Sequence, residues 1–263
     1  MPLKRGVPMA SGHSGKLPLG RRIVIPGRNP TNALPAATGF VSTASDLVKF
    51  FSQLNPAAPR SILSREARRE MTRRHWREEH SALHRTYGLG TISGHTAGWD
   101  WFGHSGGFQG FITRTAVVPD ADVTISILTN AIDGLANPWI DGALHILRAH
   151  ARHGAPTRTT RGWSGRWWTA WTCGDLVPLG DRVLEAQPAL VNPLLDASEV
   201  RVTRSGKRAA DGKITLAGGF ANHGERARLE RDARGRASAL WLGGTKLLPE
   251  ARIAAELNKR YRG

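Results

Sequence analysis

The sequence predicts a mixed α/β (α+β) fold in which an antiparallel sheet flanked by helices is followed by a small all-β, barrel-like domain. In the first half of the chain, a capped amphipathic helix precedes several strand-like segments, and a second amphipathic helix follows them. In the second half, short strand-like runs recur between Gly-containing turns. The 263 residues, of which 40% are hydrophobic and 22% charged, are sufficient for two globular domains.

The helices of the first half are indicated by their start signals. Residues 1–35 are rich in Gly, Pro and Arg and predict irregular or edge structure. Thr43 opens a capping-box-like pattern followed by apolar residues at helical spacing, which predicts a helix over 44–54. A second, strongly charged helix opens at Ser64 and runs to about Thr72, and we expect it to shield the core rather than build it.

Strand signals follow. The predicted strands cover residues 87–93, 99–102, 110–118 and 123–129. Turn residues at 119–122 join the last two into an antiparallel hairpin. Pro138, at a first helical position, then begins a helix over 139–149 that has one apolar face.

The remainder of the chain has a different pattern. We assign 1–150 to the first domain, 151–161 to a linker without periodicity and 162–263 to a small all-β domain that ends in a short helix. The predicted strands of this domain lie at 163–171, 183–186, 200–203, 213–216, 227–231 and 237–242. Turn pairs such as Asp211-Gly212, Arg234-Gly235 and Gly243-Gly244 separate them.

Aromatic residues are concentrated where the small domain starts. The four tryptophans of this segment are Trp163, Trp167, Trp168 and Trp171. Such a cluster could form a platform for carbohydrates or bases, but it is more often the core of a small β-domain or its interface with a larger one. We therefore favour an interface between the small domain and the larger one.

Composition excludes several classes of protein. The net charge is +16, but the basic residues are dispersed along the chain, so we expect solvated charged faces and no specific nucleic-acid partner. No apolar run approaches the ~18 residues of a membrane span, and no signal-peptide core is present, so we expect no membrane partner and leave the compartment open. Cys173 is the only cysteine, which excludes an intramolecular disulfide and a Cys-based zinc site. We expect neither a metal nor a cofactor.

The segment His104-Ser105-Gly106-Gly107 is the most informative one for chemistry. Two glycines let their N–H groups approach an anion or a developing oxyanion closely. The histidine and the serine add a titratable group and a hydroxyl beside them. Taken alone, the segment is more often a Gly-bearing strand bend or hairpin with an incidental histidine.

The order of several motifs extends this interpretation. They lie at residues 37–47, 62–64, 87–90, 104–107 and 128–130. Over about 9–150 this order resembles the second half of the β-lactamase-related serine hydrolases, which include class C β-lactamases, low-molecular-weight penicillin-binding proteins, esterases and D-aminopeptidases. The resemblance implies that His104, Ser105 and Gly106 contact the substrate and that the Gly107 N–H completes the oxyanion hole. The C-terminal domain resembles the small β-barrel-like extension of some members.

The family's other two site motifs are missing from this sequence. No serine is followed by a lysine three places on, and neither tyrosine is followed by an asparagine at the second position. Acyl transfer through a covalent intermediate needs a nucleophile with an adjacent base. Ser42, Asp46 and the 75–80 segment offer no substitute, because they have the patterns of helix caps and a charged loop.

We therefore expect a C-terminal fragment of a serine hydrolase that is inactive alone. Its full-length form would transfer an acyl group from a small-molecule substrate, which is a β-lactam, a D-amino-acid peptide or a small ester. The sequence leaves the oligomeric state open. The alternatives are a non-catalytic module that binds a peptide or glycan on the same scaffold and, more weakly, a basic nucleic-acid-binding protein.

Overall fold

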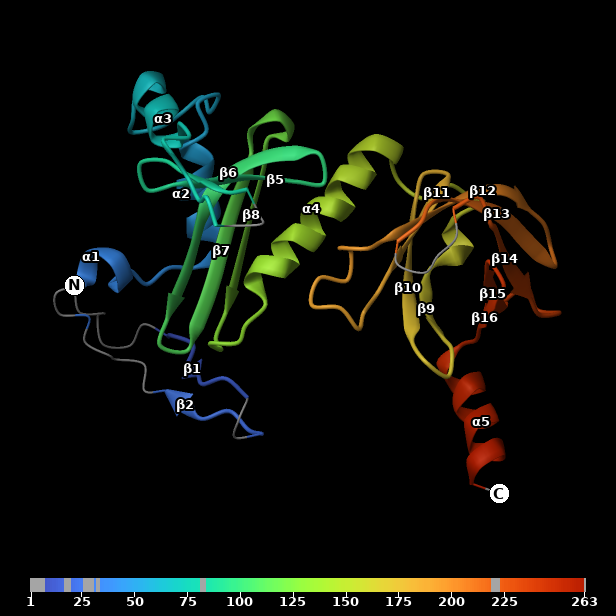
Figure 1. Cartoon of the computed structure of the whole chain (residues 1–263). Coiled ribbons are helices and arrows are strands. Elements are labelled where there is room, and N and C mark those ends of the chain that lie inside the picture. Colours follow the sequence, from blue (N-terminus) through green and yellow to red (C-terminus); the bar gives the residue numbers. More distant parts are fainter. Residues whose placement is uncertain are drawn as a thin grey trace. The chain divides into compact units, whose positions relative to one another are not determined.

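The computed structural model, which describes residues 8–16, 20–25, 31, 34–80, 84–218 and 223–262, has the predicted mixed α/β fold with antiparallel sheets (Figure 1). Contacts divide the chain into two compact units, Met1–Leu144 and His145–Gly263. The assignment of 151–161 as a linker stays a prediction.

The first unit contains a six-stranded antiparallel sheet in the order β3-β4-β5-β6-β7-β8. Its strands are β3 (Trp76–Arg77), β4 (Thr86–Tyr87), β5 (Ile92–Thr96), β6 (Trp99–Phe108), β7 (Phe111–Val118) and β8 (Val123–Thr129). The predicted hairpin between the last two is confirmed: a 3-10 turn, η1 (Pro119–Ala121), and a left-handed Asp122 join them. β6 is six residues longer than predicted and carries the whole His104 to Gly107 segment.

The helices of this unit begin largely as their capping signals predict. They are α1 (Pro35–Thr38), α2 (Ala44–Gln53), α3 (Arg65–Thr72) and α4 (Ala136–His153). The Thr43 side chain accepts a hydrogen bond from the Asp46 N–H, and Ser64 caps α3 in the same way. α4 begins two residues before Pro138, which is tolerated because a first-turn residue needs no intrahelical N–H bond.

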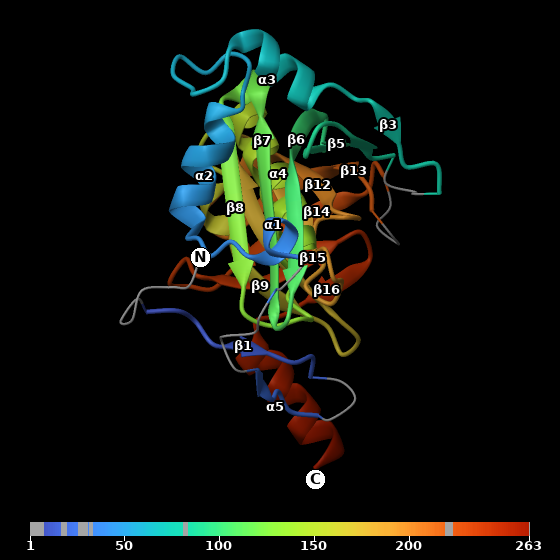
Figure 2. The ribbon, with the colours of Figure 1, turned by 90° about the vertical axis from the view of Figure 1, so that its left-hand side faces the viewer.

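Helices cover both faces of the sheet (Figure 2). On one face, alternate residues of β6 such as Trp99 and Trp101 pack with Ile140 and Leu144 of α4. On the opposite face, Phe102 packs with residues of α2 and its C-terminal end. Met71 of α3 joins this second cluster and Arg68 is buried, so α3 helps to build the core, contrary to the expectation that it only shields it.

The chain before α1 forms the predicted edge structure where it is described. β1 (Gly12–His13) and β2 (Val24–Ile25) are two-residue strands that pair with each other. Parts of this prediction, residues 1–7, 17–19, 26–30 and 32–33, lie outside the described residues.

The strand predicted over 87–93 is wrong in one respect that matters for the site. It is broken into β4 and β5 by a turn at residues 88–91. Gly90 has a positive φ of 77°, and a Cβ on Gly88 would lie 2.5 Å from the Met71 carbonyl oxygen. The two glycines therefore form a turn that packs tightly against the end of α3.

The second unit is an eight-stranded antiparallel meander in the order β9 to β16. Its strands are β9 (Gly165–Trp168), β10 (Cys173–Leu179), β11 (Arg182–Ala186), β12 (Ser198–Ser205), β13 (Ala209–Leu216), β14 (Arg226–Arg231), β15 (Ala237–Leu242) and β16 (Thr245–Leu247). Trp168 and Leu248 exchange two backbone hydrogen bonds of 2.8 Å, and this bridge closes the sheet into a barrel. The C-terminal helix is α5 (Glu250–Tyr261).

Two details of the barrel differ from the prediction. Asp211-Gly212 lies inside β13 rather than in a turn. A glycine is needed at position 212 because a Cβ there would lie 2.7 Å from Val200, next to a β-bulge. The segment 163–171 is not one strand: η2 (Arg161–Trp163) precedes β9, and a turn follows it. Trp163 and Trp167 belong to the barrel core, whereas Trp171 is 93% exposed. The interface with the larger domain stays a prediction.

Candidate functional site

The hairpin that joins β6 to β7 determines where the glycine N–H groups point. Gln109 and Gly110 form its two-residue loop, and both have positive φ, which is typical of a type I′ turn. Phe108 and Phe111 flank this loop and are therefore a hydrogen-bonded pair. By alternation along the strand, the N–H groups of Ser105 and Gly107 point away from β7.

This outer edge of β6 is open where the motif lies. β5 begins at Ile92, which pairs with Gly103, and among the described residues no strand continues alongside Ser105 or Gly107. Gly107 is exposed, so its N–H is free to donate to a group outside the strand. We call this segment of β6 the open edge. Its geometry suits the role predicted for Gly107, which stays a prediction.

His104 is held in a defined orientation beside the open edge. Its Nδ1 lies 2.5 Å from the carbonyl oxygen of Ser105, which can only accept, so Nδ1 carries the proton. In the neutral ring Nε2 then accepts, and it lies 2.9 Å from the Tyr87 hydroxyl. The two rings meet edge to face at 5.8 Å. The imidazole is thus fixed by two hydrogen bonds.

The contact of Tyr87 with His104 was not predicted from the sequence, in which Tyr87 begins the strand predicted over 87–93 and is not followed by a Y-x-N asparagine. The two residues are 17 positions apart and on different strands. Only the sheet order brings β4 near β6, so no spacing rule could indicate this pair.

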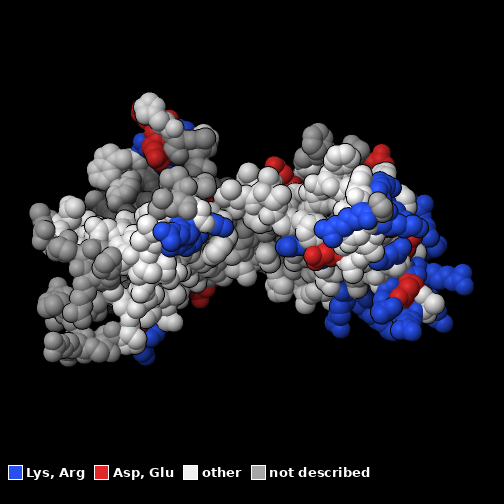
Figure 3. Space-filling model, turned by 90° about the horizontal axis from the view of Figure 1, so that it is seen from below, with Lys and Arg blue, Asp and Glu red and all other residues white. Residues whose placement is uncertain are grey.

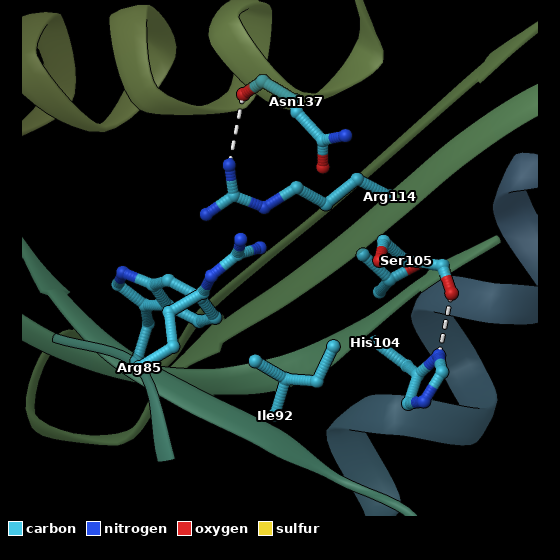
Figure 4. A pocket seen from close by; sticks show the side chains of 8 residues that line it. Arg85, Ile92, His104, Ser105, Arg114 and Asn137 are labelled. Atoms are coloured by element: carbon cyan, nitrogen blue, oxygen red, sulfur yellow. Dashed lines mark hydrogen bonds between the residues drawn. The ribbon is translucent and has the colours of Figure 1, made fainter. Parts of the chain in front are cut away.

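A small cleft lies next to the motif (Figure 4). Its lining residues are Arg85, Ile92, Trp101, His104, Ser105, Arg114, Thr115 and Asn137. Ser105 and Arg114 are direct cross-strand partners on β6 and β7, which places the serine hydroxyl and the guanidinium on one face of the sheet.

Arg114 is an almost fully buried cation at this cleft. Its side chain is 8% exposed, lies 2.9 Å from an Asp141 carboxylate oxygen and donates to the Asn137 carbonyl at 2.9 Å. The guanidinium stacks over Trp101 at 4.5 Å. Burial lowers the pKa of Arg114, Asp141 raises it, and the nearby Arg85 lowers it further.

Arg85 is a second cation at the cleft, and its positive charge has a more distant carboxylate partner than that of Arg114. Glu78 lies 3.4 Å from its Nε, but outside hydrogen-bond geometry, so the buried Nε has no hydrogen-bond partner among the described atoms. Each guanidinium has a carboxylate nearby, and the feature that favours an anionic group is the Arg85 Nε–H, which has no hydrogen-bond acceptor among the residues that the structure describes. In the sequence, nothing indicated Arg114 beyond its place in the strand predicted over 110–118.

The structure does not assemble a substitute nucleophile from the other candidates. Asp46 bonds to Thr43 at the start of α2, and the Ser42 hydroxyl donates to the Thr43 carbonyl. His75 pairs with Glu70 at 3.0 Å. Among the described residues no group of three His, Cys, Asp or Glu could hold a metal ion, and no helix is long and apolar enough to cross a membrane.

Comparison with known proteins supplies the family. The sequence profile of the beta-lactamase family matches residues 5–142, just over half of the chain. The chain therefore belongs to the beta-lactamase family. No curated protein sequence matches it significantly.

Three solved structures were compared with the chain. The octameric penicillin-binding protein homologue from Pyrococcus abyssi has 15% identity and a TM-score of 0.44 over 91% of this chain and 53% of that one. SurE has 18% identity and a TM-score of 0.40 over 94% and 58%, and SurE with D-Leu has 17% and 0.32 over 79% and 49%. This chain thus spans about half the length of the structures that it matches.

Proposed function

We propose that this chain forms the substrate side of a serine acyl-transfer site. The reaction would act on a β-lactam, a D-amino-acid peptide or a small ester, with the nucleophile and its base supplied by a polypeptide segment that is not in this sequence. The observation that carries the proposal is the Gly107 N–H at the open edge, next to an oriented His104. Without a nucleophile, the 263-residue chain alone should have no turnover.

The cleft supports a substrate with a negative charge. Arg114 is rigidly held by Asp141, Asn137 and Trp101, so its guanidinium is positioned before a ligand binds. Ser105 lies across from it and can donate a hydroxyl hydrogen bond. Ser105 lines this cleft, and Gly107 lies two residues farther along β6.

Exposed apolar side chains support a missing partner segment on the α2 side of the unit. Phe40, Val41, Phe50 and Ile62 are each more than half exposed, and Ile62 is 92% exposed. Scattered apolar residues are ordinary on a surface, but four large ones within 23 residues are more than a free surface needs. We propose that the nucleophile-bearing segment covers them.

The first experiment uses the chain as it is. It should neither hydrolyse a chromogenic cephalosporin or a p-nitrophenyl ester nor be labelled by a fluorescent penicillin or a fluorophosphonate. Stoichiometric labelling of any serine would contradict the missing nucleophile.

A second experiment tests the substrate side directly. N-acetyl-D-alanine, a carboxylate, should shift the amide NMR signals of Gly106 and Gly107, whereas its neutral carboxamide should not. Ser105→Ala should weaken the carboxylate's effect, while Ser164→Ala, in the other unit, should leave it unchanged. Equal shifts with both ligands, or none with either, would refute the anionic cleft.

A third experiment restores the nucleophile-bearing half. Gly107→Pro should then lower kcat about 10²–10³-fold because one oxyanion donor is removed, and circular dichroism must show an intact fold since proline disturbs strands. His104→Ala should weaken substrate binding or leaving-group assistance. If both folded variants keep full activity, the segment is only a strand bend. Binding without conversion in the restored protein would favour the non-catalytic peptide- or glycan-binding module.

A further inference from the structure

The outer surface of the barrel concentrates cations that are scattered in the sequence. Val200, Val202 and Ile214 face the core, so the residues that alternate with them face outward. The outward residues of three adjacent strands include the basic Arg201, Arg204, Lys213, Arg226 and Arg228 and the acidic Glu199, Asp211 and Glu230. We call the outward side of β12, β13 and β14 the basic face. Figure 3 shows many Lys and Arg side chains on this unit.

One carboxylate lies among three guanidiniums on this face. Asp211 is 3.0 Å from Arg226, 3.6 Å from Arg228 and 3.7 Å from Arg204. Its side chain is only 14% exposed, while those of the three arginines are 41–79% exposed. A single negative charge cannot neutralise three positive ones, so Asp211 holds an array that keeps a net positive charge and unused donors.

Like charges also face each other in register. Lys213 is the direct cross-strand partner of Arg201 on one side and of Arg226 on the other. Directly opposed like charges destabilise a sheet. Arg201 is relieved by Asp181 at 3.2 Å, but no carboxylate pairs with Lys213 in the described part of the chain. The sheet keeps these destabilising pairs of like charges, which indicates that the positive charge has a function.

The neighbouring strands of the same barrel lack this imbalance. Arg166 forms a two-point pair with Asp175, at 2.7 and 2.8 Å. Arg182 pairs with Glu199. Glu199 of β12 is engaged by Arg182, and Glu230 of β14 accepts a hydrogen bond from the Trp241 indole, so Asp211 is the carboxylate left for the arginines of the basic face.

We propose that the basic face binds the phosphodiester backbone of a nucleic acid without sequence selectivity. Guanidiniums suit phosphate because their planar forks make two parallel hydrogen bonds. Alternate residues along a strand repeat every ~6.8 Å and adjacent strands every ~4.8 Å, so the array offers several contacts to one backbone. The proposal is independent of the acyl-transfer site, which lies in the other unit.

A membrane surface fits this face less well. Peripheral membrane binding combines cations with apolar side chains that enter the bilayer. Among the described residues of β12 to β14, Leu216 is the only large apolar side chain that is more than half exposed, so this face offers little that could enter a bilayer. The contacts are to charge and not to base edges, which is why no sequence selectivity is expected.

The test is fluorescence anisotropy with two unrelated labelled 20-nucleotide DNA strands, at salt concentrations between 50 and 200 mM. Both strands should bind with equal affinity, and binding should weaken steeply with salt as counterions are released. The triple variant Lys213→Ala/Arg226→Ala/Arg228→Ala should lose about tenfold or more in affinity. Its log–log salt slope should become shallower by about 2, since each phosphate contact on a single strand contributes ~0.7.

Two further variants make the result specific. Lys259→Ala/Arg260→Ala/Arg262→Ala removes the same charge from the exposed end of α5 and should leave the affinity within about threefold of wild type. Arg204→Glu changes a side chain that is 79% exposed, so it should weaken binding without affecting folding. Equal losses in the two triple variants would overturn the proposal, as would no binding at 50 mM salt or binding to phosphatidylglycerol vesicles but not to DNA.

Discussion

The buried Arg114 gives a stability prediction that needs no enzymatic activity. Arg114→Leu removes the partner of Asp141, the hydrogen bond to Asn137 and the cation over Trp101. Breaking a buried pair from one side typically costs about 3–5 kcal/mol because the remaining charge stays buried. The Asp141 side chain keeps 27% exposure, so water can reach it and we expect about 2–4 kcal/mol.

The double variant Arg114→Leu/Asp141→Leu separates two contributions to the loss of stability: the lost ion pair and the cost of leaving the Asp141 carboxylate unpaired. Replacing both partners by apolar groups is often nearly neutral, so we expect about 1 kcal/mol, from the unsatisfied Asn137 carbonyl. Hydrogen exchange of β6 and β7 peptides measures this unit without interference from the barrel. If the single variant costs less than about 1 kcal/mol, or if the double variant costs the sum of the two single ones, Arg114 is not held as described.

Three further predictions concern local features. Burial raises the pKa of Glu185 above its ordinary value of 4.5, so the folded state favours the neutral carboxyl and loses stability as the pH rises from 4.5 through the raised pKa. Glu185→Gln should therefore raise Tm at pH 7. An increase in Tm that persisted below pH 4.5 would contradict this. A Cβ on Gly103 would lie 2.0 Å from a carbonyl oxygen of β7, so Gly103→Ala should cost about 1–3 kcal/mol or more in urea unfolding, whereas Gly107→Ala should cost less. Ser64→Ala removes the cap of α3 and should cost about 0.5–2 kcal/mol, against a negligible effect for the exposed Ser42→Ala.

The elements that sequence predicts best are those specified by neighbouring residues. The start of α2 was predicted because Thr43 and Asp46 form their hydrogen bonds within one turn. The hairpin between β7 and β8 was predicted because its turn residues are contiguous. β10 was not predicted, since Gly174 and Pro178 are poor strand residues and only pairing with β9 and β11 on both sides keeps them in a strand.

The residues of the candidate site also fall into two groups, those that neighbouring residues indicate and those that only the folded sheet brings together. The motif from His104 to Gly107 is contiguous, so sequence analysis could select it. Tyr87, Arg85 and Arg114 could not be selected as its neighbours, because strand order and register across two hairpins bring them there. The basic face escaped detection for the same reason: its cations are spread over three strands and meet only through pairing.

The open edge itself depends on a residue far from the motif. Met71, at the end of α3, accepts hydrogen bonds on its carbonyl oxygen from the Leu89 N–H at 3.0 Å and from the Thr91 hydroxyl at 2.7 Å. These bonds hold the turn after β4 against α3, so β5 cannot begin before Ile92. If that turn were extended, a strand would continue along β6 and pair with the Gly107 N–H. The small charged helix therefore anchors the turn that precedes β5, the strand on whose side β6 stays unpaired at Gly107.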